Sequence, residues 1–316
     1  MKKSMIKLLT LATILTSSSV FAAWPDKPIT IIVPWGAGGN TDTVARLVAQ
    51  GLQKELGVNV NVVNRTGGSG VVGHDALKRA APDGYTLGVV TAEIALMHHQ
   101  KMTDLTYADY TPISRLAVIY GGLQVAKDSP YKNATQLIDF IKKHPGKLKA
   151  SGSGLNSIWH LNLLGMLKSA GLPASSVKYI PSQGSSAALQ ELVSGGIDFI
   201  TSSPGEAKSM VDAGMVRHLA IMSPEPSKLY ANVPVFKKAT GYNWTLTAWN
   251  VLAAPKALPS DIENKLIAAM KKVYQSGELQ SFANKQGFEV SALYGNDVTQ
   301  FMAQEDQKFG ELLKAE

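Results

Sequence analysis

Backbone N–H groups at a glycine-rich turn are the groups best suited to binding chemistry in this chain. Apolar residues 29–33 are predicted to form a buried strand, and Gly36, Gly38 and Gly39 follow it closely. Glycine has no Cβ, so such a turn lets the backbone approach a bound group. Apolar residues at helical spacing begin after the turn, and the first N–H groups of a helix lack internal partners. The turn is therefore predicted to hold a carboxylate or a phosphate.

The residues after this turn have two expected roles. Asn40 or Thr41 is expected to cap the helix. Asp42 is an awkward neighbour for an anion, so we expect it to fix the loop through hydrogen bonds from the first helical turn. A plain strand-to-helix connection is the alternative, but open α/β sheets bind ligands at such turns. The ligand contacts expected here are Trp35, Ala37, Gly38, Gly39, Asn40, Thr41 and Asp42.

A second turn, over residues 151–157, has the same physical form. Serine hydroxyls and free N–H groups precede a helix expected over residues 156–170, so this turn could hold a second carboxylate across a cleft. His160 lies one or two turns into that helix, where it either bonds a neighbouring loop or contacts the ligand. The expected contacts are Ser151, Ser153, Gly154, Asn156, Ser157 and His160.

Further candidates follow the ends of other predicted strands. Glu93 would repel an acid unless it accepts a hydrogen bond from a ligand hydroxyl or amine. Trp249, on a predicted strand over residues 245–254, either forms a wall of the pocket or packs in the core. The expected contacts in this group are Thr91, Ala92, Glu93, Ser182, Gln183, Ser202 and Trp249.

Motifs of catalysis and of cofactor binding are weak or missing. The pattern G-x-G-x-x-G at residues 68–73 follows a strand, but no acidic residue ends the next strand as a dinucleotide site requires. His98 and His99 are adjacent, and neighbours in sequence rarely bind one metal together. No nucleophile elbow, H-E-x-x-H motif, Walker A loop or cysteine is present. We therefore expect no catalytic residue, cofactor or metal, although an unfamiliar hydrolase of small esters or amides stays open.

The elements that must position these groups alternate between strand and helix. This alternation predicts an α/β fold in which open, mostly parallel sheets are flanked by helices. The length suggests two lobes: lobe 1 from residues 23–122 and 248–316, and lobe 2 from residues 123–247. Strand-like segments near 118–126 and 245–254 would cross between the lobes as a two-strand hinge. The C-terminal helices have no predicted sheet of their own and should pack on lobe 1.

The composition and the N-terminal segment limit where the protein is located and which partners it can have. Residues 1–22 have the lysines, the short apolar core and the small residue at Ala22 that are typical of a secretory signal peptide cleaved after Ala22. The formal net charge is +7, of which that segment supplies three lysines. The remaining charge is mild and no arginine-rich stripe occurs, so we expect no nucleic-acid partner.

Several motifs in order resemble one family, the periplasmic solute receptors of tripartite tricarboxylate transporters, known as TctC or Bug proteins. They are the segments 24–42, 64–70, 81–87, 152–154 with His160, 195–198 and 248–255. The resemblance implies a two-lobed, type II-like periplasmic binding protein that closes on a small organic acid. This chain departs from the family's usual pattern at Trp35, at Ser182 and Gln183, and at Asn250.

The resulting expectation is a periplasmic receptor for a di- or tricarboxylate or a related organic acid. The resemblance implies TctA- and TctB-like membrane subunits as partners, and we expect a monomer. A sensor that presents the ligand to a histidine kinase would differ only in its partner, and an exported hydrolase on the same fold is the rival from another class.

Overall fold

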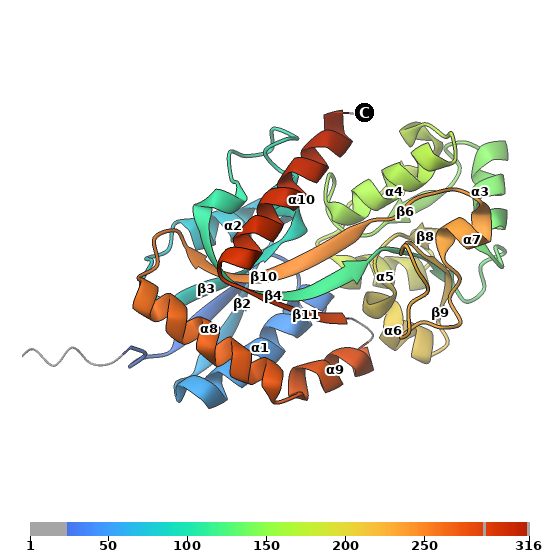
Figure 1. The fold of residues 1–316 in the computed structure, drawn as a ribbon. Helices are drawn as coiled ribbons and strands as arrows, with labels where there is room; N and C mark the ends of the chain where they lie inside the picture. Colours follow the sequence, from blue (N-terminus) through green and yellow to red (C-terminus); the bar gives the residue numbers. More distant parts are fainter. Residues whose placement is uncertain (1–23, 287–288, 315–316) are drawn as a thin grey trace, which may run out of the picture.

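The structure, a computed structural model, describes residues 24–286 and 289–314. Two β-sheets, each with helices packed on it, lie side by side (Figure 1). The expected signal peptide over residues 1–22 lies outside the described residues. Among the described residues, no helix has the length and apolar character needed to cross a membrane.

The larger sheet has six strands in the order β11-β4-β10-β3-β1-β2. β1 pairs in parallel with β2 and β3, whereas β10 is antiparallel to β3 and β4, and β11 is antiparallel to β4. The strands are β1 (Ile29–Val33), β2 (Val60–Asn64), β3 (Thr86–Thr91), β4 (Tyr110–Tyr120), β10 (Thr247–Pro255) and β11 (Glu289–Tyr294).

Helices cover both faces of this sheet. α1, α8 and α9 pack against one another on one face, and α2 and α10 lie on the other (Figure 1). The C-terminal helices thus pack on the first lobe as expected. Their bounds are α1 (Asn40–Leu56), α2 (Val71–Lys78), α8 (Ser260–Gln275), α9 (Glu278–Gln286) and α10 (Asn296–Lys314).

The smaller sheet has five strands in the order β7-β6-β8-β5-β9. β6 is parallel to β7 and β8, and β5 is antiparallel to β8 and β9. Its strands are β5 (Gly122–Ala126), β6 (Lys149–Ser151), β7 (Lys178–Tyr179), β8 (Phe199–Ile200) and β9 (Val216–Ile221). Its helices are α3 (Ala134–Lys143), α4 (Ile158–Ser169), α5 (Ser185–Val193), α6 (Pro204–Asp212) and α7 (Phe236–Thr240).

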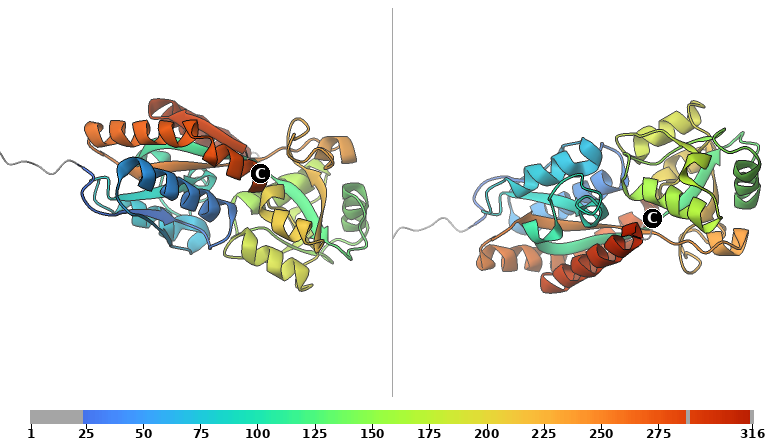
Figure 2. Two further views of the ribbon diagram at one scale, coloured as in Figure 1. Left: turned by 90° about the horizontal axis from the view of Figure 1, so that it is seen from below. Right: turned by 90° about the horizontal axis from the view of Figure 1, so that it is seen from above.

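The chain passes between the sheets at two adjacent places. β4 ends one residue before Gly121 and β5 begins one residue after it, while Leu246 directly precedes β10. Gly121 N donates to Leu246 O at 3.1 Å, and Met222 N donates to Gly121 O at 2.8 Å. The two passages are therefore hydrogen-bonded neighbours. Two views turned from Figure 1 show the two lobes side by side (Figure 2).

The predicted α/β fold is confirmed, but both sheets are mixed rather than mostly parallel. The reason is that β5 and β10, which follow the two passages between the sheets, enter their sheets antiparallel to their neighbours. The segment 118–126 is also two strands, one in each sheet, instead of one.

Predictions of local structure were partly right. Asn133 caps α3 as its position suggests, because its side chain accepts from Gln136 N at 2.9 Å. The prediction that Asn40 or Thr41 caps α1 was wrong: the cap is Gly39, whose carbonyl accepts from Thr43 N at 3.0 Å. Similarly α8 begins after Pro259, and its start carries no side-chain cap. β11 was not predicted.

Candidate ligand-binding cleft

A cleft of about 220 Å³ lies where the two sheets meet. This is the volume of roughly seven water molecules, which suits a small metabolite. The starts of α1, α4 and α5 and the strands β4 and β10 reach it. Its lining is Trp35, Gly36, Ala37, Gly39, Asn40, Thr41, Thr91, Ala92, Glu93, Ile119, Ser153, Ile158, Trp159, Gln183, Gly184, Ser185, Ser186, Ala187, Glu206, Ala248, Trp249 and Asn250.

Two helix N-termini open toward each other in this cleft. α1 and α5 both begin after a glycine, Gly39 and Gly184, and neither start carries a side-chain cap. A Cβ placed on Gly39 would lie 3.8 Å from Ser185 Oγ and 3.9 Å from Ser186 Oγ, so the two starts almost touch. Gly184 has a φ of +146°, a conformation that favours glycine. Uncapped N–H groups at two neighbouring helix starts, each at the positive end of its helix dipole, can bind an anion.

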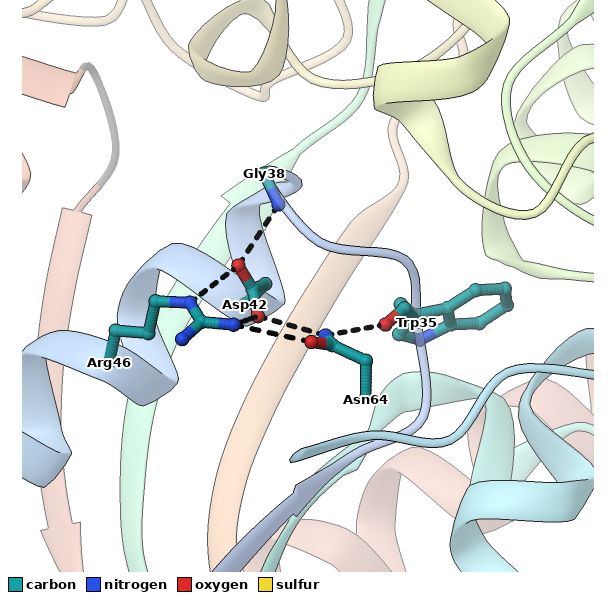
Figure 3. Close-up of polar contacts among 5 residues, drawn as sticks. All are labelled: Trp35, Gly38, Asp42, Arg46 and Asn64. Atoms are coloured by element: carbon teal, nitrogen blue, oxygen red, sulfur yellow. Dashed lines mark hydrogen bonds and ion pairs between the residues drawn. The ribbon is translucent and has the colours of Figure 1, made fainter. Parts of the chain in front are cut away.

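Asp42 holds the loop before α1 in place (Figure 3). Its carboxylate accepts from Gly38 N at 2.9 Å, from Arg46 Nε and Nη2 at 2.9 Å, and from Asn64 Nδ2 at 2.8 Å. Asn64 Nδ2 also donates to Trp35 O at 2.9 Å. Burial raises the pKa of Asp42, but these donors outweigh it and hold the pKa below its usual value. The carboxylate therefore fixes the loop and leaves the N–H groups of α1 toward the cleft.

Glu93 occupies the N-terminus of a third helix, α4. Its Oε1 accepts from Ile158 N at 3.2 Å, and its Oε2 accepts from the hydroxyl of Thr91, which in turn accepts from Trp35 Nε1 at 3.3 Å. Only 3 % of Glu93 is exposed, and this burial raises the pKa of its carboxyl. A carboxylate from the six-stranded lobe thus already sits at this helix start.

Glu206 forms a second buried carboxyl at the edge of the cleft. It accepts from Ser203 N at 2.9 Å and from the hydroxyls of Ser203 and Ser185, and Trp159 donates to it as well. Burial raises the pKa of Glu206, and these donors lower it in part. With Ser203 it forms the capping box of α6. The start of α6 is therefore also satisfied from within the protein.

The rest of the cleft is mainly apolar. Three tryptophans, two isoleucines and four alanines contribute to the wall. One polar link joins β10 to the start of α1, where Asn250 Nδ2 donates to Asn40 Oδ1 at 3.2 Å. The apolar members are Trp35, Ala37, Ala92, Ile119, Ile158, Trp159, Ala187, Ala248 and Trp249.

A comparison with protein-family models identifies what kind of protein carries this cleft. Residues 44–316 match the model described as the tripartite tricarboxylate transporter family receptor. The chain belongs to this family. It is a two-lobed periplasmic solute receptor, which agrees with the resemblance found in its motifs.

Individual relatives agree with this assignment. A UPF0065 protein encoded in the gbd 5′ region of Cupriavidus necator is 30% identical over 90% of this chain and 86% of that protein. BugT of Bordetella pertussis is 27% identical over 98% of both chains. The structure of MatC of Rhodopseudomonas palustris, solved with bound malate, has a TM-score of 0.82 and 26% identity, covering 92% of this chain and 100% of that one.

The receptor's cleft brings together many of the residues expected from the sequence. Those that line it are Trp35, Ala37, Gly39, Asn40, Thr41, Thr91, Ala92, Glu93, Ser153, Gln183 and Trp249. Trp249 serves both of its expected roles, since it is fully buried and its ring meets Phe301 edge-on with centroids 5.5 Å apart. Those placed outside the lining are Gly38, Asp42, Ser151, Gly154, Asn156, Ser157, His160, Ser182 and Ser202.

The turn at residues 151–157 is tied up in internal hydrogen bonds. Ser157 Oγ donates to Gly154 O at 2.6 Å and also bonds the hydroxyl of Ser153. His160 accepts from Asn156 N at Nδ1, 3.1 Å away, and burial lowers its pKa to about 4. This matches the interpretation of His160 as a residue that bonds a neighbouring loop.

Three other predicted contact residues lie outside the lining because they are hydrogen-bonded within the turn or buried. Ser182 Oγ donates to Gly184 O at 2.9 Å, which shapes the turn before α5. Ser151 and Ser202 are almost fully buried behind the cleft.

The start of α5 was predicted only in part, through Ser182 and Gln183 directly before it. Gly184, Ser185, Ser186 and Ala187 line the cleft, and Glu206 and Asn250 complete its polar groups. A signal for α5 was present, because a glycine directly before a helix rich in small residues is the same pattern as at Gly39.

The two remaining motifs have structural contacts in the receptor. In the G-x-G-x-x-G segment, Ser69 Oγ donates to Leu155 O at 2.6 Å, which links the two lobes at the rim. His98 and His99 face Asp306 of α10, with Nε2 to carboxylate distances of 3.2 and 3.6 Å.

Proposed function

We propose that this receptor binds a small organic acid in the cleft, with a carboxylate held by backbone N–H groups at the starts of α1 and α5. The observation that carries the proposal is the pair of uncapped helix N-termini, one from each lobe, that face each other across Gly39 and Gly184. An anion there would satisfy donors from both lobes at once, so binding would favour the closed arrangement.

The lobes in this proposal are residues 23–122 with 248–316, and residues 123–247. The adjacent passages at Gly121 and Leu246 form the hinge between them. The signal peptide is removed after Ala22, and the loaded receptor delivers its acid to TctA- and TctB-like membrane subunits. The family assignment supports this transport role. A role in presenting the acid to a sensor kinase would use the same cleft.

We further propose that the cleft does no catalysis. Among the described residues that line it there is no histidine, lysine or cysteine to activate a nucleophile. The hydroxyl of Ser153 bonds that of Ser157, and the hydroxyl of Ser185 bonds the carboxyl of Glu206. The family model that matches the chain is described as a receptor.

Calorimetric titration of the mature protein at pH 7.5 tests the proposal with a matched pair, hexanoate and its uncharged amide hexanamide. Charge-assisted hydrogen bonds contribute about 1.5–3 kcal/mol each, so hexanoate should bind at least tenfold more tightly. Equal affinity for the amide, or no binding by any acid in a wider panel, would contradict the proposal. Release of alcohol from ethyl hexanoate would support the hydrolase instead.

A further inference from the structure

We propose that the cleft selects acids with a single carboxylate and an uncharged body, and that Glu93 is the residue that excludes a second carboxylate. This inference rests on the proposed function, because it concerns what the far end of the bound acid meets. It assigns Glu93 a role in specificity as well as in positioning α4.

The ionisable side chains that line the cleft are all acidic. Glu93 and Glu206 contribute two carboxyls, and no lysine, arginine or histidine lines the cleft within residues 24–286 and 289–314. A ligand with two or three negative charges would therefore find no side-chain cation in the cleft to pair with its further carboxylates.

Among the helix starts that the described part of the chain brings to the cleft, those of α1 and α5 are free for an anion. The starts of α1 and α5 are uncapped and lie together at one end. The start of α4 donates to Glu93 through Ile158 N, and the start of α6 is closed by Ser203 and Glu206. The second carboxylate of a diacid would have no comparable partner within the cleft.

Several hydrogen-bond donors converge on the carboxyl of Glu93. The hydroxyl of Thr91 and the N–H groups of Ile158 and of Glu93 itself all donate to its carboxyl. These donors favour the carboxylate form, while burial raises the pKa of Glu93. Glu93 can still accept a bond from a ligand hydroxyl, but it already occupies the α4 donor that a second ligand carboxylate would need.

The body of the acid meets apolar side chains instead. Ile119, Ile158, Ala248 and the tryptophans Trp35 and Trp159 line the remaining wall. Burying an alkyl or aryl group against them is favourable, while burying a charge there is costly unless it is paired.

Three acids of one chain length test the inference: hexanoate, monomethyl adipate and adipate. Calorimetry at pH 7.5 should show hexanoate binding at least tenfold more tightly than adipate, with monomethyl adipate close to hexanoate. The ester keeps a polar end and removes only its charge. This comparison is made on the wild-type protein, so it does not depend on the folding of any variant.

The role of Glu93 is tested by the ratio of the hexanoate and adipate affinities in Glu93→Gln. We expect the ratio to narrow at least threefold there and to stay unchanged in Glu191→Gln, an exposed carboxylate on α5 outside the cleft. Adipate binding as tightly as hexanoate, or an unchanged ratio in Glu93→Gln, would overturn the inference and leave the proposed function standing. Absence of binding by these three acids and by every acid of the wider panel would refute both.

Discussion

At the scale of single residues, the proposed binding depends on backbone donors more than on side chains. Asn40 is the first residue of α1, so its backbone N–H has no acceptor within the helix. Its side chain does something separate, because its Oδ1 accepts from Asn250 of β10. The two contributions can therefore be separated by substitution.

Asn40→Pro removes the N–H and Asn40→Ala keeps it. Proline is tolerated at the first helical position, and the preceding Gly39 has the extended backbone that proline requires of its neighbour. Because both variants lose the bond to Asn250, their difference reports the N–H. We expect Asn40→Pro to bind the acid roughly 10- to 150-fold more weakly than Asn40→Ala in calorimetry. Equal affinities would show that this donor is not used.

His74 sets a pH dependence of stability. It is 1 % exposed, its Nδ1 donates to Gly70 O at 2.7 Å, and its Nε2 accepts from Thr91 N at 3.1 Å, an arrangement that needs the neutral ring. Burial lowers the pKa of His74 to about 4. In the unfolded chain the pKa is about 6.5, so the unfolded state takes up the proton first as the pH falls.

The contribution of His74 to stability is therefore full above pH ~6.5 and declines as the pH falls toward 4. Between pH 7.5 and 4.5 the loss should be roughly 2–3 kcal/mol. His74→Gln does not titrate, so its free energy of unfolding should fall by that much less over the same range in denaturant titrations. His144→Gln, at an exposed histidine, is the control and should follow the wild type. Parallel curves for all three proteins would refute the assignment.

At the scale of elements, one carboxylate joins β1, α1 and β2. Asp42 of α1 binds the loop at Gly38 and shares Asn64, the last residue of β2, with the carbonyl of Trp35 (Figure 3). Arg46 completes the arrangement from the next helical turn. The direction of the α1 start therefore depends on a residue that does not line the cleft.

Asp42→Asn keeps the side-chain shape and removes the charge. We expect a loss of about 1–3 kcal/mol in the free energy of unfolding, since several charge-assisted bonds weaken, and a several-fold loss of acid affinity. Asp75→Asn is the matched control because Asp75 pairs with Arg79 at the same spacing on an exposed surface, and it should change stability by less than about 0.5 kcal/mol. Equal effects of the two variants on affinity would argue against the role of Asp42.

The sequence predicted the first half of this site better than the second. The loop before α1 was found because glycines, an apolar strand and a helix follow one another there. The role of Asp42 in fixing that loop followed from its charge. The choice of the 151–157 turn as the opposing half could not foresee that Glu93, distant in sequence, fills the start of α4. Long-range contacts of this kind leave no local pattern.

At the scale of the whole molecule, the two lobes meet directly around the cleft. Gly36 N donates to Gln183 O at 3.3 Å, Thr66 Oγ1 donates to the side chain of Gln183 at 3.3 Å, and Ser69 bonds Leu155. These bonds bring the α1 and α5 starts together. An acid bound between them would add donors from both lobes to this closed arrangement.

The architecture was largely predictable and its strand directions were not. Alternating elements and length indicated two α/β lobes with two passages between them. The mixed sheets depend on where β5 and β10 insert, which is decided by the passage through Gly121 and Leu246. β11 pairs with β4 through an irregular register, and its short segment near the C-terminus has no strong alternation.

The most direct test of the account is a crystal structure of the mature receptor with hexanoate or the tightest-binding acid of the panel. We expect the carboxylate within hydrogen-bond distance of backbone N–H groups at the starts of both α1 and α5, with its body against Trp35 and Trp159. A carboxylate bound at α4 in place of Glu93, or held by one lobe alone, would contradict the account.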